Sequence, residues 1–231
     1  MFHGSRVALT KWFWTLYLLS ADKGGLSALR LTKLIGVQWR TAQGMLNSLR
    51  AAMAERDSHY RLSELVEVDD AYVGSNKTGK AGRGGGRTPL LVAIEKSADG
   101  KPGFVAIEVL DSLEKRHIID FAQRRLQPDA ICHTDAFPSL AGLAVQATHI
   151  AKITPPEEAD EWLPWVHIVI ANLKRFLLGT FHGAVRAHGL QAYVDEFVYR
   201  FNRRFWEAQI PNRLLALCVG ASGPPLRGTG A

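Results

Sequence analysis

Along the first 60 residues, apolar positions recur at the spacing of amphipathic helices. The run Trp12–Leu19 is apolar and is followed by the two glycines of "DKGG", so it predicts one buried helix that ends there. A second helix is expected after Ser27, which can serve as its N-cap, and Gly36 allows a turn at its end. The residues of this helix expected to face inward are Leu29, Leu31 and Leu34.

A third helix is expected from about Gln38. Its apolar face holds Ala42, Met45, Leu46 and Leu49. Two helices joined by a short turn with glycine are typical of a helix-turn-helix, in which the second helix enters the DNA major groove. The residues expected on its exposed side, facing DNA, are Arg40, Gln43 and Asn47. A plain helical hairpin produces the same pattern and remains an alternative.

From Leu62 onward the pattern changes to alternation. The stretches "RLSELVEVDDAYVG", "TPLLVAIEK" and "GFVAIEVLD" predict three strands of a meander, with turns rich in glycine and lysine between them. "LEKRHIIDFAQRRL" predicts a helix, "DAICHTD" a short buried strand that ends on Asp135, and helical patterns return from about Trp165. The chain is therefore expected to be an α/β protein, with a mixed sheet flanked by helices and preceded by a small all-α region.

Near the C-terminus, aromatic residues recur every four positions in "AYVDEFVYRFNRRF". This stripe predicts a helix face in the core, formed by Tyr193, Phe197, Phe201 and Phe205. Arg203 and Arg204 beside it are candidate contacts for DNA phosphates, with an ordinary surface role as the alternative. The glycine-rich stretch "NKTGKAGRGGGR" adds the candidates Lys80, Arg83 and Arg87, which could contact the DNA backbone or belong to a solvated turn.

The composition is that of an ordinary globular protein, with 47% hydrophobic and 22% charged residues. The run Trp12–Leu19 is far shorter than the roughly 20 apolar residues that a bilayer span needs, and no secretory leader is recognisable. Cys132 and Cys218 are far apart and lack CxxC spacing. They are expected to be reduced thiols in a cytoplasmic protein, which argues against a disulfide framework or a cysteine zinc site.

Charge is unevenly distributed along the chain. Residues 1–60 hold eight Lys and Arg against three Asp and Glu, whereas residues 61–160 hold twelve against fifteen and residues 161–231 hold eight against four. Basic flanks around an acidic centre suit a polyanion contacted at both ends, although such blocks also arise by chance.

Asp69 on the first strand and Asp135 at the end of the later strand are candidate metal ligands. A single acid at a strand end is usually a cap or turn residue. Two acids on adjacent central strands repel each other unless a cation lies between them. Such oxygens suit Mg²⁺ or Mn²⁺, and two ions can activate a water molecule and stabilise the leaving oxygen of a phosphodiester. Asp70 should point to the opposite face, because side chains alternate along a strand.

Five stretches occur in a distinctive order: "VEVDDAYVG", the basic glycine-rich loop, "TDAFPSL", "LPWVHIVIANLKRFLLGTFHG" and "EFVYRFNRR". On these, the chain resembles the ISXO-type insertion-sequence transposases (the IS fifteen-ninety-five group) of the DDE superfamily, from about residue 5 to residue 216. The resemblance implies a ribonuclease-H-like catalytic domain and a metal-dependent DNA transposase that cleaves and joins the ends of its element. The expected division is a helix-turn-helix region at 1–60, the catalytic domain at 61–216 and a flexible tail at 217–231.

The resemblance also implies roles for individual residues. Asp69 would be the first metal ligand, Asp135 the second, and Lys174 would hold a DNA phosphate. The third ligand should be a carboxylate seven residues before the lysine, but His167 stands there, with Asn172 as an alternative. Because imidazole is neutral and prefers softer ions, a site completed by His167 should tolerate Mn²⁺ at least as well as Mg²⁺.

The partners implied are the terminal inverted repeats of the element and target DNA, with no membrane. Work on two DNA ends implies at least a homodimer. Two other functions remain open at this point. One is a catalytically inactive, transposase-derived DNA-binding protein, which the histidine at position 167 favours. The other is a ribonuclease-H-like nuclease acting on RNA–DNA hybrids, which strand transfer would distinguish.

Overall fold

Five strands form one mixed sheet in the order β3-β2-β1-β4-β5 in the computed structural model of the chain. The strands are β1 (Leu65–Val73), β2 (Thr88–Lys96), β3 (Pro102–Val109), β4 (Ile131–Thr134) and β5 (Thr148–Ala151). β1, β2 and β3 are an antiparallel meander, whereas β4 and β5 run parallel to β1, which therefore lies at the centre. The structure describes residues 2, 4–74, 87–153, 155, 159–181 and 187–220.

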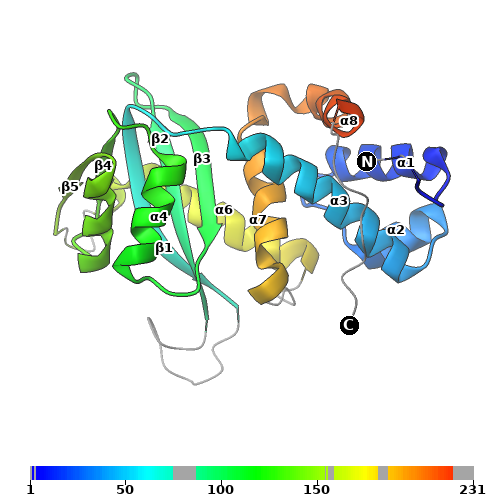
Figure 1. Cartoon of the computed structure of the whole chain (residues 1–231), viewed down its shortest axis with the longest axis horizontal. Coiled ribbons are helices and arrows are strands. Elements are labelled where there is room, and N and C mark those ends of the chain that lie inside the picture. The colour runs from blue at the N-terminus through cyan, green and yellow to red at the C-terminus, as the bar shows by residue number, and fades with distance from the viewer. Residues whose placement is uncertain are drawn as a thin grey trace.

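Helices cover both faces of this sheet. The α-helices are α1 (Leu9–Ala21), α2 (Ala28–Ile35), α3 (Trp39–Ser58), α4 (Lys115–Arg125), α5 (Ala159–Trp162), α6 (Pro164–Phe181), α7 (Ala187–Phe201) and α8 (Ile210–Gly220), and the 3₁₀ helices are η1 (Pro138–Val145) and η3 (Arg204–Gln209). α4 and η1 pack on one face, and α6 and α7 on the other. Figure 1 shows the sheet at one end of the molecule and α1, α2 and α8 at the other, with α3 between them.

The alternation along β1 decides which of its acids face the same helix. Val68 belongs to the core beneath α4, whereas Ala71 belongs to the core beneath α6 and α7. Glu67 and Asp69 lie two residues apart on the α6 side, because every second residue of a strand shares a face. Asp70, between them and the next inward residue, points to the opposite face of the sheet, as the sequence predicts.

The N-terminal helices form a third core with α8. The expected start of α2 is confirmed, because Ser27 Oγ accepts a hydrogen bond from the Arg30 amide at 3.2 Å. Gly36 ends the helix in the left-handed conformation (φ 62°), and its amide is bonded to the Thr32 carbonyl. Only residues 36–38 separate α2 from α3, and all four predicted apolar residues of α3 are buried. Two helices joined by a three-residue turn are therefore present where the sequence predicts them.

Two predictions of burial in this region are wrong. α1 was expected to be buried, but Phe13, Trp14 and Tyr17 are exposed, because α3 and α8 cover only one side of the helix. In α2, Leu29 and Leu34 are exposed as well, and of the three expected core residues only Leu31 is buried. None of the described helices combines the length and hydrophobicity required to cross a membrane.

The aromatic stripe near the C-terminus is confirmed in part. Phe197 is buried, and Tyr193 and Phe201 pack against the same core, but Phe205 is 73% exposed. The difference arises because α7 ends at Phe201 and the chain continues in η3, so the four-residue spacing no longer keeps one face. α8 then continues to Gly220 with Cys218 buried, which extends ordered helix past the boundary expected at residue 216.

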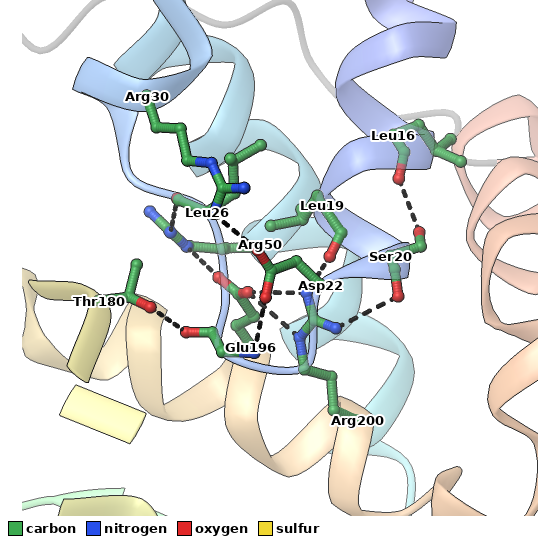
Figure 2. Close-up of polar contacts among 11 residues, drawn as sticks. Leu16, Leu19, Ser20, Asp22, Leu26, Arg30, Arg50, Thr180, Glu196 and Arg200 are labelled. Carbon is green, nitrogen blue, oxygen red and sulfur yellow. Dashed lines mark hydrogen bonds and ion pairs between the residues drawn. The ribbon is translucent and has the colours of Figure 1, made fainter. Parts of the chain in front are cut away.

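A buried ion pair joins the helical region to the sheet region. Arg50 Nε on α3 lies 2.8 Å from Glu196 Oε2 on α7, and both side chains are almost inaccessible to solvent. Arg200 binds the other oxygen of Glu196 at 3.0 Å and also donates to the carbonyls of Leu19 and Ser20 at the end of α1 (Figure 2). Arg50 also lies over the Tyr193 ring. The N-terminal helices are therefore packed against the sheet region.

Candidate active site

Three of the residues predicted as metal ligands border one cavity. Asp69 comes from β1, Asp135 follows β4, and His167 lies in the first turn of α6. The cavity has a volume of about 460 Å³. The other residues around it are Ala136, Phe137, Pro138, Lys152, Ile153, Trp162 and Leu163. The central sheet and α6 thus bring together residues that are up to 98 positions apart in sequence, from 69 to 167.

Asp69 is the most perturbed acid of this cavity. Burial, together with the negative charges of Asp70 and Asp135, raises its pKa to about 6. Its Oδ1 accepts a hydrogen bond from the Asp70 amide at 2.8 Å, and its Oδ2 lies 3.4 Å from Nε2 of His167. Asp69 is therefore in an environment that favours a nearby positive charge.

Asp135 lies where β4 ends. Its Oδ1 accepts a hydrogen bond from the Phe137 amide at 3.0 Å, so the carboxylate also holds the turn after the strand. The indole of Trp162 donates to the Thr134 carbonyl at 2.9 Å and stacks on His133 with a centroid distance of 4.1 Å. These contacts fix the end of β4 against the segment that leads into α6.

The geometry of α6 separates the two alternatives for the third ligand. His167 is beside Asp69, whereas Asn172 lines a different cavity of about 940 Å³ between α1, α6, α7 and η3. Five residues turn an α-helix by about 140° beyond one full turn, so the two side chains leave opposite sides of α6. Of the two, only His167 is next to the paired acids.

Lys174 and Arg87 border a further cavity of about 260 Å³ at the end of β1. Lys174 is exposed and lies two helical turns from His167. Nε of Arg87 is buried and has no hydrogen-bond partner among the described residues. Lys174 on α6 and Arg87, directly before β2, therefore lie beside the end of β1 and outside the acidic cavity.

A model described as the ISXO2-like transposase domain matches residues 61–202, which is more than half of the chain. The chain belongs to the ISXO2-like transposase family. The strand order, with an antiparallel meander beside two parallel strands, is the ribonuclease-H-like arrangement of the DDE superfamily, so the predicted fold is confirmed. The strand order and the family match therefore agree on the fold of residues 61–202.

Two solved structures are similar to this transposase at low identity. They are described as "Mos1 transposase paired-end complex with left transposon end" and "Crystal structure of a pre-cleavage Mos1 transpososome". The identities are 13% and 12%, over 95% and 97% of this chain and 81% and 83% of the solved chains, with a TM-score of 0.33 for each. A TM-score this low supports no inference about the site. No curated protein matches the chain.

One buried acid near the cavity was not predicted from the sequence. Glu67, two residues before Asp69 on the same strand face, is fully buried, and its Oε2 accepts hydrogen bonds from the amides of Trp165 and Val166 at 2.8 and 3.0 Å. Burial raises its pKa. The sequence did contain a signal for this residue. An acid stands at an inward-facing position of a central strand, where an apolar residue is usual, and such an acid has a specific bonding role.

The residues of α3 predicted to face DNA lie together on the surface of the helical region. Arg40 and Asn47 are exposed and Gln43 is half-buried, with its amide donating to Asn47 Oδ1 at 2.9 Å. Their contact with DNA stays a prediction. Lys80 and Arg83 of the glycine-rich stretch lie outside the described residues.

Arg203 does not have the surface position that a phosphate contact needs, which corrects the prediction. It is 6% exposed, its guanidinium binds Asp57 at 2.8 Å, and it stacks on the Tyr199 ring. Arg204 is half-buried and donates to the carbonyls of Pro102, Gly103 and Phe201. Both arginines thus fasten the end of α7 to its neighbours.

The donors around the acidic cavity fit a divalent cation. Two carboxylates and an imidazole are ligands that Mg²⁺ or Mn²⁺ accepts, and a cation would offset the repulsion that raises the pKa of Asp69. Within the described part of the chain, however, no three His, Cys, Asp or Glu side chains already form a complete ligand group. The three residues therefore share a cavity without forming a finished metal site.

Proposed function

We propose that this protein is the transposase of an insertion sequence, which cleaves the ends of its element and joins them to target DNA in the cytoplasm. The observation that carries the proposal is the cavity shared by Asp69, Asp135 and His167 in an ISXO2-like transposase domain. Such an acid-rich cavity at the centre of a ribonuclease-H-like sheet suits phosphodiester chemistry.

Asp69, Asp135 and His167 would hold Mg²⁺ or Mn²⁺, which supplies an activated water and stabilisation of the leaving oxygen. The residues of the chain have the complementary task of positioning DNA. Lys174 would bind a phosphate as a point charge, and Arg87, which borders the same cavity, would supply a second positive charge for the DNA backbone. Both cations are at the end of β1, so the DNA strand would run along α6 past His167.

We further propose that α3 reads the terminal inverted repeats. Arg40, Gln43 and Asn47 lie on its exposed side in a helix-turn-helix arrangement, where the second helix contacts base edges. Two ends of one element must be brought together before they are joined to target DNA, so the active form would be at least a homodimer.

The test uses the full chain and labelled linear DNA that carries the ends of the element. Cleavage and joining would be measured in Mg²⁺, in Mn²⁺ and in EDTA, for the unchanged protein, Asp135→Ala and Asp129→Ala. Asp129 is an exposed acid outside the cavity and serves as the matched control. We expect metal-dependent nicking and joining in the unchanged protein and in Asp129→Ala, and neither in Asp135→Ala.

Other outcomes would contradict the proposal. Tight, sequence-specific binding of the ends without cleavage in either metal would identify an inactive DNA-binding derivative of a transposase. Cleavage of RNA–DNA hybrids without strand transfer would identify a nuclease. Activity that persists in Asp135→Ala would show that the chemistry takes place elsewhere.

A further inference from the structure

Glu67 is a carboxylate in the middle of the central strand, where its side chain has no contact with solvent. Burying such a group is costly unless it is well bonded. Nζ of Lys96 lies 3.8 Å from its Oε1, which has no hydrogen-bond partner among the described residues. The bonds that account for its burial are therefore those of Oε2.

Oε2 of Glu67 caps the start of α6. It accepts hydrogen bonds from the amides of Trp165 at 2.8 Å and Val166 at 3.0 Å, which are the second and third residues of the helix. The first four amides of a helix have no partner within the helix, and Pro164 at the first position has none to offer. A carboxylate there also interacts favourably with the helix dipole. One oxygen of Glu67 thus fixes the origin of α6 on β1.

The next residue of α6 after this cap is His167. Asp69 is two positions after Glu67 on the same strand face, about 6.6 Å along the strand. Asp69 and His167 are 3.4 Å apart, and β1 positions both of them. Asp69 is part of the strand itself, and His167 is held through the bonds of Glu67 to the start of α6. We propose that Glu67 is a positioning residue that sets His167 against Asp69, an inference that rests on the proposed function of this site.

The position of the start of α6 matters more when the third metal ligand is a histidine than when it is a glutamate. A glutamate reaches toward a metal on a long, flexible side chain, whereas an imidazole is shorter and rigid, so the backbone of α6 must be set more closely. A rotation or shift at the start of the helix would be passed directly to the ring of His167.

Three substitutions separate the hydrogen bonds from the charge. Glu67→Gln keeps the length and one oxygen that can accept both amides. Glu67→Asp keeps the charge but is one methylene shorter and cannot span the same distance. Glu67→Ala removes both. The matched control is Glu95→Ala on β2, whose carboxylate also accepts two backbone amides, from Ser63 and Phe104, but outside the cavity.

Two readouts use the full-length, metal-free protein. Hydrogen exchange would be measured at the amides of Trp165 and Val166, and nuclear Overhauser contacts between the ring of His167 and the β-protons of Asp69. In Glu67→Asp and Glu67→Ala we expect both amides to exchange about ten-fold faster or more, since a bond to a charged group is lost, and the ring contacts to disappear. Glu67→Gln should retain both, and Glu95→Ala should change neither.

A third readout is the kinetics of end cleavage. Glu67→Asp and Glu67→Ala should lower kcat about ten-fold or more with KM for DNA unchanged, and Glu67→Gln should restore it. The proposal is overturned if Glu67→Asp keeps the ring contacts and kcat, or if Glu67→Gln loses them. If Glu67→Ala does not fold, Glu67→Asp and Glu67→Gln still test the proposal. If the unchanged protein cleaves no DNA, the two metal-free readouts still test the role of Glu67. Failure of the proposed function is therefore distinguishable from failure of this inference.

Discussion

Arg203 shows that a basic residue predicted from the sequence to contact DNA can instead be structural. Its guanidinium binds Asp57, which also accepts from Asn202, and all three side chains are buried. Removing one partner of a buried ion pair leaves the other charge unpaired, which typically costs about 3–5 kcal/mol. We therefore expect Arg203→Ala to lower the free energy of unfolding by this amount, measured by urea denaturation.

The matched control for this prediction is Arg213→Ala. Arg213 is exposed, and among the described residues it donates to Gln209, four positions earlier, and lies over the Trp206 ring. Its loss should change the free energy of unfolding by about 0.5 kcal/mol or less. Equal effects in the two variants would contradict a buried structural role for Arg203.

Asp195 makes stability depend on pH. Burial raises its pKa from 3.8 to about 6, opposed by the Gln191 hydrogen bond and Arg125 and reinforced by Glu108 and Asp57. The folded protein binds the proton more tightly than the unfolded chain, so this group lowers stability as pH rises from about 4 to about 6. Asp195→Asn stays neutral and can still accept from Gln191. It should be about 1–3 kcal/mol more stable than the unchanged protein at pH 7.5.

The measurement is urea denaturation of both proteins at pH 7.5 and pH 4.5. At the lower pH the difference should shrink to about a third, because Asp195 is protonated in the folded state there, while in the unfolded chain the carboxyl, with its pKa of 3.8, is still mostly ionised. A difference that is the same at both values would show that packing, not ionisation, separates the two proteins.

Lys174 and Arg87 should reveal phosphate contacts through salt dependence. Each phosphate contact that is lost lowers the slope of log K against log salt by about 1. We expect Lys174→Ala and Arg87→Ala each to weaken binding of cognate and unrelated DNA alike. The measurement is DNA affinity at several salt concentrations, and an unchanged slope would exclude a phosphate contact.

At the scale of elements, α3 has two ends with different expected roles. Its first turns carry Arg40 and Gln43 on the exposed side, whereas its last turns pack on α7. A good base contact contributes about 1–3 kcal/mol of discrimination. Gln43→Ala and Arg40→Ala should therefore reduce the preference for element ends over scrambled DNA, measured by competition binding. Arg56→Ala, near the other end of the same helix, should leave that preference unchanged.

The strands and helices themselves were largely accessible from the sequence. Alternation in β1 predicts that Asp69 faces the opposite side from Asp70, and helical spacing relates His167 to Lys174. The sequence does not predict which elements a helix packs against, because periodicity defines the apolar face of a helix but not the elements that bury it. This is why Leu29 and Phe205 were expected in the core. The role of Glu67 depends on hydrogen bonds to amides 98 and 99 residues away, which no local pattern contains.

At the scale of the whole molecule, the boundary expected at residue 60 does not separate two independent cores. α3 contributes Arg50 and Asp57, and both bind partners on or next to α7, Glu196 and Arg203. α8, at the opposite end of the sequence, completes the core of the N-terminal helices. The helical region is thus built from both ends of the chain, with the sheet region between them in sequence.

This arrangement predicts that the chain unfolds as one unit and that the catalytic region does not fold without α3. A fragment of residues 61–220 would leave Glu196 with Arg200 but without Arg50, would remove Asp57 from the buried Arg203, and would expose Tyr199 and Leu214, each of which is almost fully buried. Far-UV circular dichroism and tryptophan fluorescence should give coincident transitions for the full chain and no cooperative transition for the fragment. A fragment of residues 38–220 restores both ion pairs and should regain a transition, at lower stability. A cooperative transition in the 61–220 fragment would instead show that the sheet and its helices are an autonomous domain, and that Arg50 and Asp57 serve only to orient α3.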